Sequence, residues 1–134
     1  MIKVSAIIVT IGAKDYLKRC LDSLLGQTHP LYEIIVIDNS LKPGLAGQIN
    51  KLYPLVKLYS SVENLFYTSA LNKGIGLSSG EFILCLNDDV ILDKEFIREA
   101  LKGFLVSSKI GSVSGKILRS DGKTLDSTGL FLSI

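Results

Sequence analysis

Three stretches of the chain are almost continuously apolar and rich in β-branched residues. They occupy residues 4–10, 32–38 and 81–88, and a weaker stretch of the same kind occupies 55–61. Apolar runs of this length, without strict alternation, are typical of strands that are buried on both faces of a parallel sheet. A further pattern at 110–118 predicts a fifth strand.

Between these runs, apolar residues recur at the spacing of an amphipathic helix. The pattern predicts helices over 14–27, 44–53, 68–79 and 93–107. Gly26 follows the last apolar pair of the first helix as a stop signal, and Asp93 is a good N-cap for the fourth. Asp121-Gly122 indicates a hairpin turn. Alternating strands and helices predict a three-layer α/β/α fold with a mostly parallel central sheet, in a single domain over residues 1–134.

Length, composition and net charge argue against a disordered protein, a nucleic-acid-binding protein and a membrane-spanning protein. The 134 residues suffice for one domain, and an apolar share of 47% with a charged share of 21% argues against disorder. The net charge of +2 gives no general reason to expect nucleic acid as a partner. No secretory signal is visible, and no apolar run approaches the roughly 20 residues that span a bilayer. The chain ends on the apolar stretch LFLSI without a polar tail, so we expect it to be truncated at its C-terminus.

The two cysteines, Cys20 and Cys85, lie in different apolar stretches. Neither has a cysteine or histidine partner at the short spacing of a zinc site, so we expect no zinc. We interpret both as thiols of the core in a reducing compartment, and the sequence leaves a disulfide between them open.

Polar residues stand at the carboxyl ends of the three strongest strands. These ends carry, in chain order, Thr10, Asp38-Asn39 and Asn87-Asp88-Asp89. In open parallel sheets, ligands bind beyond the carboxyl ends of the strands. The oxygen-bearing side chains therefore predict a polar cleft at one edge of the sheet.

The adjacent carboxylates of Asp88 and Asp89 repel each other, and a divalent cation is one way to hold them together. Mg²⁺ and Mn²⁺ prefer oxygen ligands, and Mg²⁺ commonly takes one or two carboxylates together with substrate phosphates and water. The alternative is that either acid caps the following turn or is solvated. Asp38 also has two interpretations: it accepts hydrogen bonds from a ribose or a base N–H, or it is a turn residue.

Other catalytic patterns are weak. His29, the only histidine, lies in a loop before a proline, which argues against a catalytic role and against a Ser/His/Asp triad. The turn after the first strand is TIGAKD and lacks the G-x-G-x-x-G fingerprint of a dinucleotide-binding enzyme.

The chain resembles family 2 glycosyltransferases, and within them the rhamnosyltransferase-like branch, in VSAIIVTIGAKDYLKRCLDSLLGQTHPLYEIIVIDNS and ENLFYTSALNKGIGLSSGEFILCLNDDV. The most specific pieces are LDSLLGQTHPLYEIIVIDN and the spaced set Asn64, Asn72, Gly74, Gly80 and Asn87-Asp88-Asp89. Leu65 stands where the family usually has glycine, and residues 9–12 are VTIG where it often has PTYN.

The resemblance implies a GT-A fold that binds a nucleotide-diphospho-sugar and transfers the sugar, with inversion, to an acceptor hydroxyl. NDD occupies the position of the family's D-x-D motif, so Asp89 is implied as the ligand of Mn²⁺ or Mg²⁺ and Asp88 as the residue facing the ribose or sugar. Asp38 is implied as a nucleobase contact, with Thr10 beside the base. The remaining members of the implied nucleotide-sugar site are Asn64, Asn72 and Asn87.

The implied donor is a UDP- or dTDP-sugar, and the implied acceptor is a saccharide or a lipid-linked molecule, in the cytoplasm or at the inner face of the membrane. The family's general base lies well after NDD, where this sequence has ended. Asp126, near the end of the sequence, is a weak candidate that we interpret as part of the sugar pocket rather than as the base. We therefore expect the chain to hold only the donor-binding half, to self-associate and to transfer no sugar by itself.

Two other functions compete with this interpretation. A non-catalytic nucleotide-binding module, or an inactive fragment, would share the fold and lack the downstream acid. A phospho-acceptor signalling domain has a similar alternation of elements, but it requires acids at the end of the first strand, where the sequence is IVTIG.

Overall fold

The computed structural model describes residues 1–12 and 15–127. Its elements are, in chain order, β1 (Val4–Thr10), α1 (Tyr16–Leu25), β2 (Glu33–Asp38), α2 (Leu45–Leu52), β3 (Val56–Ser60), α3 (Phe66–Leu77), β4 (Phe82–Asn87), α4 (Phe96–Phe104), β5 (Ile117–Leu118) and β6 (Leu125–Ser127). Within this part of the chain, no helix is long and apolar enough to cross a membrane.

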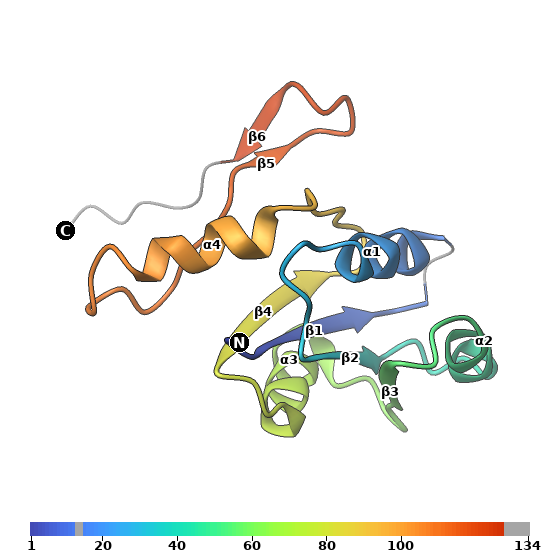
Figure 1. The fold of residues 1–134 in the computed structure, drawn as a ribbon. Coiled ribbons are helices and arrows are strands. Elements are labelled where there is room, and N and C mark those ends of the chain that lie inside the picture. The colour runs from blue at the N-terminus through green and yellow to red at the C-terminus, as the bar shows by residue number, and fades with distance from the viewer. Residues whose placement is uncertain (13–14, 128–134) are drawn as a thin grey trace.

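The first four strands form one parallel sheet in the order β3-β2-β1-β4 (Figure 1). The β5–β6 hairpin is a separate antiparallel pair. In Figure 1, α1 and α4 lie above the sheet and α3 lies below it. The predicted α/β/α architecture with a mostly parallel sheet is therefore confirmed.

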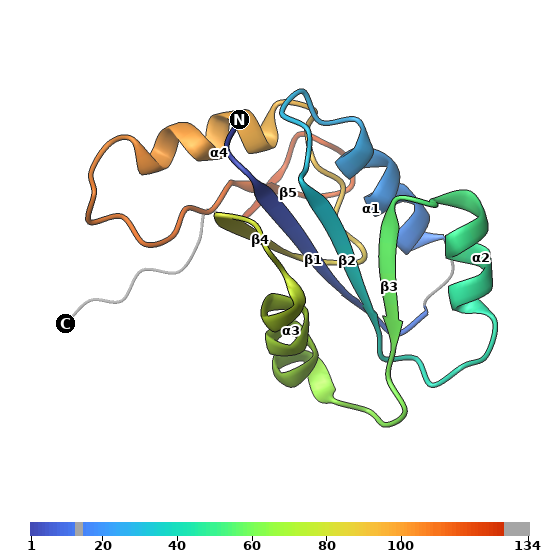
Figure 2. The ribbon, with the colours of Figure 1, turned by 60° about the horizontal axis from the view of Figure 1, so that its bottom comes forward.

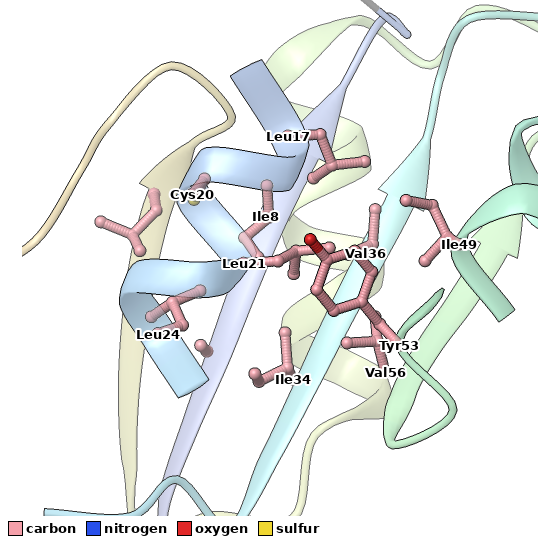
Figure 3. Close-up of a cluster of buried hydrophobic side chains, with 12 residues drawn as sticks. Ile8, Leu17, Cys20, Leu21, Leu24, Ile34, Val36, Ile49, Tyr53 and Val56 are labelled. Atoms are coloured by element: carbon pink, nitrogen blue, oxygen red, sulfur yellow. The ribbon is translucent and has the colours of Figure 1, made fainter. Parts of the chain in front are cut away.

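The larger part of the core lies between the sheet and helices α1 and α2. Figure 3 shows Leu17, Leu21 and Leu24 of α1 directed toward Ile8 and Val36 of the two central strands. All five side chains are almost fully buried. Each such burial is worth about 1.5–3 kcal/mol relative to an exposed side chain, so this apolar stripe is the main reason that α1 docks where it does.

The opposite face of β1 and β2 is covered by α3. The helix approaches closely because it has glycine at the point of contact: a Cβ on Gly74 would lie 2.3 Å from Cγ2 of Ile7. On the other face, beside β4, the ring of Phe82 lies 4.8 Å from the ring of Phe104 in α4, measured between centroids.

The prediction that 81–88 is buried on both faces is wrong for the described residues. β4 is an edge strand, Ile83 is 41% exposed, and Cys85 is exposed as well. Cys85 is level with Ile7 in the register, so both side chains point to the face that α3 covers at β1 and β2. Cys20 is thus buried as expected of a core thiol, whereas Cys85 is not, and no disulfide joins them because both are free.

Two local predictions also need correction. Of the strand predicted at 110–118, only Ile117–Leu118 is extended and paired, and its partner is β6 rather than the main sheet. The helix α4 begins at Phe96 rather than directly after Asp93, but the Asp93 side chain makes the predicted capping contact, because its Oδ1 accepts a hydrogen bond from the Glu95 backbone N–H at 2.8 Å. The predicted turn at Gly122 is confirmed by its φ of +68°.

Candidate functional site

The strand register brings the predicted polar residues to one edge of the sheet. Thr10 at the end of β1 is level with Asp38 at the end of β2, and Asp38 is level with Ser60 at the end of β3. On the other side of β1, Thr10 Oγ1 donates a hydrogen bond to Oδ2 of Asp88 at 2.5 Å. The expectation that Thr10, Asp38 and Asp88 share one edge is therefore confirmed.

This hydrogen bond explains part of how an apolar strand can end on two carboxylates. Asp88 is half-buried and has the Thr10 hydroxyl as its partner, while Asp89 is exposed to water. The Thr10 oxygen in turn accepts a hydrogen bond from the Gly12 backbone N–H at 3.0 Å. Gly12 adopts a φ of +70°, a left-handed conformation that glycine accepts without strain. The turn after β1 therefore orients Thr10 toward Asp88.

The negative charges of Asp88 and Asp89 affect the pKa of a neighbouring thiol. Burial, and then the charges of Asp88 and Asp89, raise the pKa of the Cys20 thiol to about 12. None of the ion pairs in residues 1–12 and 15–127 involves Asp38, Asp88 or Asp89. The edge therefore carries uncompensated carboxylates within the described chain.

Those carboxylates do not form a complete metal site by themselves. Among the described residues, no three His, Cys, Asp or Glu side chains are grouped so that they could hold a metal ion. Asp88 and Asp89 nevertheless match the donor set of a Mg²⁺ or Mn²⁺ ion that takes one or two carboxylates and completes its shell with phosphate oxygens and water.

A pocket of about 330 Å³ opens beside Asp38. Its wall includes Lys42 from the loop before α2, Ala46 from α2 itself, and Ser60 and Val62 from the end of β3 and the loop that follows it. Asp38 itself is only 2% exposed, and its carboxylate accepts hydrogen bonds from the Ser40 N–H at 3.0 Å and the Ser60 hydroxyl at 3.4 Å. Asp38 is thus a rigid acceptor at the base of an open pocket, and it also orders the turn that follows β2.

A larger cavity, of about 410 Å³, lies between β4 and α4. Its wall includes Phe82, Phe96 and Phe104. The cavity lies at the amino end of β4, away from the strand end that carries the acids. Among the side chains of the residues that line it, only Glu81 and Ser112 are polar. We therefore assign the polar chemistry to the edge formed by the carboxyl ends of the strands, called the carboxyl edge below.

Asn39 and Asn64 form a hydrogen-bonded bridge between the end of β2 and the start of α3. Asn39 Nδ2 donates to Asn64 Oδ1 at 2.8 Å, and Asn39 Oδ1 accepts from the Leu65 N–H at 2.9 Å. Asn64 Oδ1 also accepts from the Phe66 N–H at 2.9 Å. The backbone conformation that favours glycine occurs at Phe66, with φ +54°, and not at Leu65, with φ −77°.

The side chains of the other predicted site residues in the described chain form no hydrogen bond or ion pair with those of Thr10, Asp38 or Asp88. Asn72 is exposed on α3, and Asn87 is exposed at the end of β4. Asp126 lies in β6, outside the main sheet, where its Oδ1 is 3.3 Å from Nε of Arg119 in an exposed ion pair.

Sequence reasoning missed a buried polar network at the opposite, amino edge. The Glu33 carboxylate accepts hydrogen bonds from the Ser5 hydroxyl (2.7 Å), the Lys57 ammonium (2.7 Å) and the Ser79 N–H (2.6 Å). Burial raises the pKa of Glu33, but these three hydrogen bonds outweigh it and the pKa lies below its ordinary value. The available signal was a glutamate at the start of an apolar run, level in the register with Ser5.

The QTHP segment has a structural role. Gln27 is buried, and its amide nitrogen donates to the Asp93 carbonyl at 2.7 Å while its amide oxygen accepts from the Ile97 N–H at 3.0 Å. It thereby fastens the start of α4 to the end of α1. His29 Nε2 lies 3.0 Å from the carbonyl oxygen of Ile2, away from the acids, which agrees with the loop role expected for it.

Comparison with known proteins agrees with this arrangement. The sequence model "Glycosyl transferase family 2" matches residues 5–129. Glycosyltransferase GlyA of Streptococcus pneumoniae serotype 4 is 26% identical over 103 residues, and chondroitin synthase of Pasteurella multocida is 30% identical over 113 residues. These alignments cover 75% and 82% of this chain but only 15% and 12% of the two relatives.

Two solved structures share the fold. S. aureus TarS 1–349 in complex with UDP superposes with a TM-score of 0.68 at 24% identity, covering 78% of this chain and 32% of that one. Mannosyltransferase PcManGT from Pyrobaculum calidifontis, in complex with GDP-Man and Mn²⁺, gives 0.69 at 22% identity, covering 76% and 32%. Because the family model matches nearly the whole described chain, this protein belongs to glycosyl transferase family 2.

Proposed function

We propose that this chain, as one domain, is the donor-binding part of an inverting, metal-assisted glycosyltransferase of the nucleotide-sugar type. The observation that carries the proposal is the convergence of three strand ends: Asp38 lies in an open pocket, and Asp88 is hydrogen-bonded to Thr10 on the neighbouring strand. Because Thr10 lies between Asp38 and Asp88 on the central strand, the two acids are about two strand spacings, or ~10 Å, apart, a span that a nucleoside diphosphate can cover.

Each part of that ligand has a matching group at the edge. The pocket beside Asp38 receives the nucleobase, whose N–H groups meet the carboxylate, while Thr10 lies beside the base. Asp88 faces the ribose or the sugar. The exposed amides of Asn72 and Asn87 supply further contacts, and Asn64 acts through the turn that it holds.

Asp89 is the residue that would hold a divalent cation, Mn²⁺ or Mg²⁺, because it is exposed and has no cationic partner in the described chain. Such an ion would neutralise the charge that develops on the departing diphosphate. The chain's own contribution is to bind the nucleotide-sugar donor and to hold its sugar at the carboxyl edge of the sheet.

The transfer breaks the bond between the anomeric carbon and the diphosphate oxygen, and it forms a bond from that carbon to the acceptor oxygen. The acceptor hydroxyl loses its proton to a general base. We place neither this base nor the acceptor platform in the described residues, because Asp126 is held by Arg119 in the hairpin. The acceptor is a saccharide or a lipid-linked molecule, and the donor is a UDP- or dTDP-sugar.

The names of the two structural neighbours support the class of ligand. They state that TarS was crystallised with UDP and the mannosyltransferase with GDP-Man and Mn²⁺. The aligned part amounts to 32% of each neighbour.

Calorimetric titration of UDP, dTDP and GDP with and without Mn²⁺ tests the proposal. Asp89→Asn should remove the increase in affinity that Mn²⁺ produces, because it removes the anionic oxygen. Glu81→Gln is the matched control, since Glu81 is an exposed carboxylate directly before β4, whereas Asp89 follows the other end of that strand, and it should leave that increase intact. An Asp89→Asn variant with unchanged Mn²⁺-dependent affinity would refute the assignment.

A transfer assay separates the donor-binding part from a complete enzyme. We expect binding without multiple turnovers, because base catalysis alone typically contributes about 10²–10⁴-fold. Multiple turnovers that disappear in Asp126→Asn would show that the hairpin supplies the base. Failure to bind any nucleoside diphosphate would favour the alternative, an inactive fragment.

The proposal includes a cytoplasmic location, in which the inner face of the membrane provides any lipid-linked acceptor, and self-association through the open edge of β4. Fractionation of cells that express the protein tests the location. Sedimentation at increasing concentration tests association, and a sedimentation coefficient that is constant over this range would contradict it.

A further inference from the structure

Phe66, the first residue of α3, combines two unfavourable features. Its backbone has a φ of +54°, a left-handed conformation that is an outlier for an aromatic residue, and its side chain is 76% exposed. Residues in such conformations cost stability and persist only where the surrounding structure fixes them. Since the ring is not buried, packing within the described chain does not offset that cost.

The surrounding structure does fix Phe66. Its N–H donates to Asn64 Oδ1, which also accepts from Asn39 Nδ2, and Asn39 Oδ1 accepts from the Leu65 N–H. Asn39 is itself anchored, because its backbone N–H donates to the Thr10 carbonyl at 2.8 Å. The left-handed turn is thus tied by hydrogen bonds to the end of β1 and to the residue that follows Asp38.

This arrangement places Phe66 at the carboxyl edge of the sheet. In Figure 2, the arrowhead of β3 points down to the loop that leads into α3, so the helix begins where the parallel strands end. Leu65 packs against the core under α3, whereas Phe66 belongs to neither cluster of buried side chains. The chain therefore directs Leu65 inward and leaves the Phe66 ring in solvent at the carboxyl ends of the strands, outside the wall of the pocket beside Asp38.

We propose that the Phe66 ring is a stacking platform for the nucleobase of a bound nucleoside diphosphate, with Asn39 and Asn64 as its positioning residues. This inference rests on the proposed function. A phenyl ring has no donor or acceptor, so it recognises the face of a planar ligand and not its edge. Asp38 offers the complementary property, a carboxylate that reads N–H groups on the edge of a base.

Replacement of Phe66 separates stacking from folding. Phe66→Gly removes both the strain and the ring, so it should unfold at a higher urea concentration and bind UDP about 5- to 150-fold more weakly. Phe66→Leu keeps an apolar side chain without a ring and should lose affinity similarly, whereas Phe66→Tyr should remain within about twofold of the unmodified chain. Tyr32→Leu removes an exposed ring before β2 and is the control, with unchanged affinity.

The same variants are titrated with inorganic diphosphate, which has no base to stack. The expected result is equal affinity for diphosphate in the unmodified chain and in all Phe66 variants. Unweakened UDP binding by Phe66→Gly or Phe66→Leu overturns the inference but leaves the proposed function standing. An equal loss for UDP and diphosphate also overturns it, because the ring would then act on the phosphate site. Absence of UDP binding by the unmodified chain overturns both.

Discussion

Glu33 provides the most direct test of the polar network at the amino edge. Its side chain is 3% exposed and accepts hydrogen bonds from Ser5, Lys57 and Ser79. Glu33→Ala leaves the fully buried Ser5 hydroxyl without its acceptor, and it removes two further hydrogen bonds to a charged oxygen. A buried donor without a partner costs about 1–3 kcal/mol, and hydrogen bonds to charged groups contribute about 1.5–3 kcal/mol each. Because these contributions are not additive, we expect a loss of about 2–4 kcal/mol in the free energy of unfolding.

Such a loss is a large part of the roughly 5–15 kcal/mol that stabilises a typical domain. It should lower the midpoint of thermal unfolding by on the order of 10 °C. Glu33→Gln keeps the shape of the side chain but places an amide near the Lys57 ammonium and the two other donors. It can satisfy only some of them, so its loss should be smaller than that of Glu33→Ala.

The pH dependence follows from the sign of the shift. The pKa of Glu33 is lowered in the folded state, so the unfolded chain takes up this proton first as pH falls. The stability that the Glu33 charge contributes is therefore present above the unfolded pKa of about 4.3 and is lost as pH falls through the folded pKa. The difference between the unmodified chain and Glu33→Gln should be largest at neutral pH and should shrink below about pH 4.

Urea denaturation at a series of pH values measures both effects. Glu81→Gln is the control, because Glu81 is exposed and should change the stability little. Equal free energies of unfolding for the unmodified chain and Glu33→Ala at neutral pH would refute the network's role in stability. A difference to Glu33→Gln that stays constant down to pH 3 would show that the charge is not the relevant property.

Two further predictions concern packing. Gly74→Ala should destabilise by about 1–2 kcal/mol because its Cβ meets Ile7, whereas Gly76→Ala, with no atom within 4 Å of the new Cβ, should stabilise by about 0.5–1 kcal/mol; denaturation curves of equal midpoint would contradict this. Gln27→Ala should cost about 1–3 kcal/mol and speed hydrogen exchange of the Ile97 amide, and unchanged exchange would mean that the Gln27 hydrogen bond does not hold the start of α4.

The sheet could be predicted because burial on both faces leaves a direct mark in the sequence. β1 and β2 are buried at every position, and both appear as unbroken apolar runs. β4 carries a similar run but lies at an edge, since the apolar pattern records the character of the side chains and not which neighbours cover them. Strand order, which decides this, depends on contacts between segments far apart in the chain.

The same limit applies to the site. Convergence of Thr10, Asp38 and Asp88 could be predicted, because carboxyl ends of parallel strands share an edge. The direct hydrogen bond from Thr10 to Asp88 could not, because it requires β4 to lie next to β1. The bridge between Asn39 and Asn64 joins residues 25 positions apart and leaves no local pattern.

The two edges of the sheet show why only one of them suits a phosphate-bound cation. At the amino edge, the Glu33 carboxylate is neutralised by Lys57 at 2.7 Å and has its hydrogen-bond partners within the chain. At the carboxyl edge, Asp88 and Asp89 form no ion pair with any described residue. Carboxylates without a cationic partner in the described chain are available to a bound cation, whereas one already paired with an ammonium is not. The distribution of charge over the sheet therefore favours the carboxyl edge independently of the family to which the chain belongs.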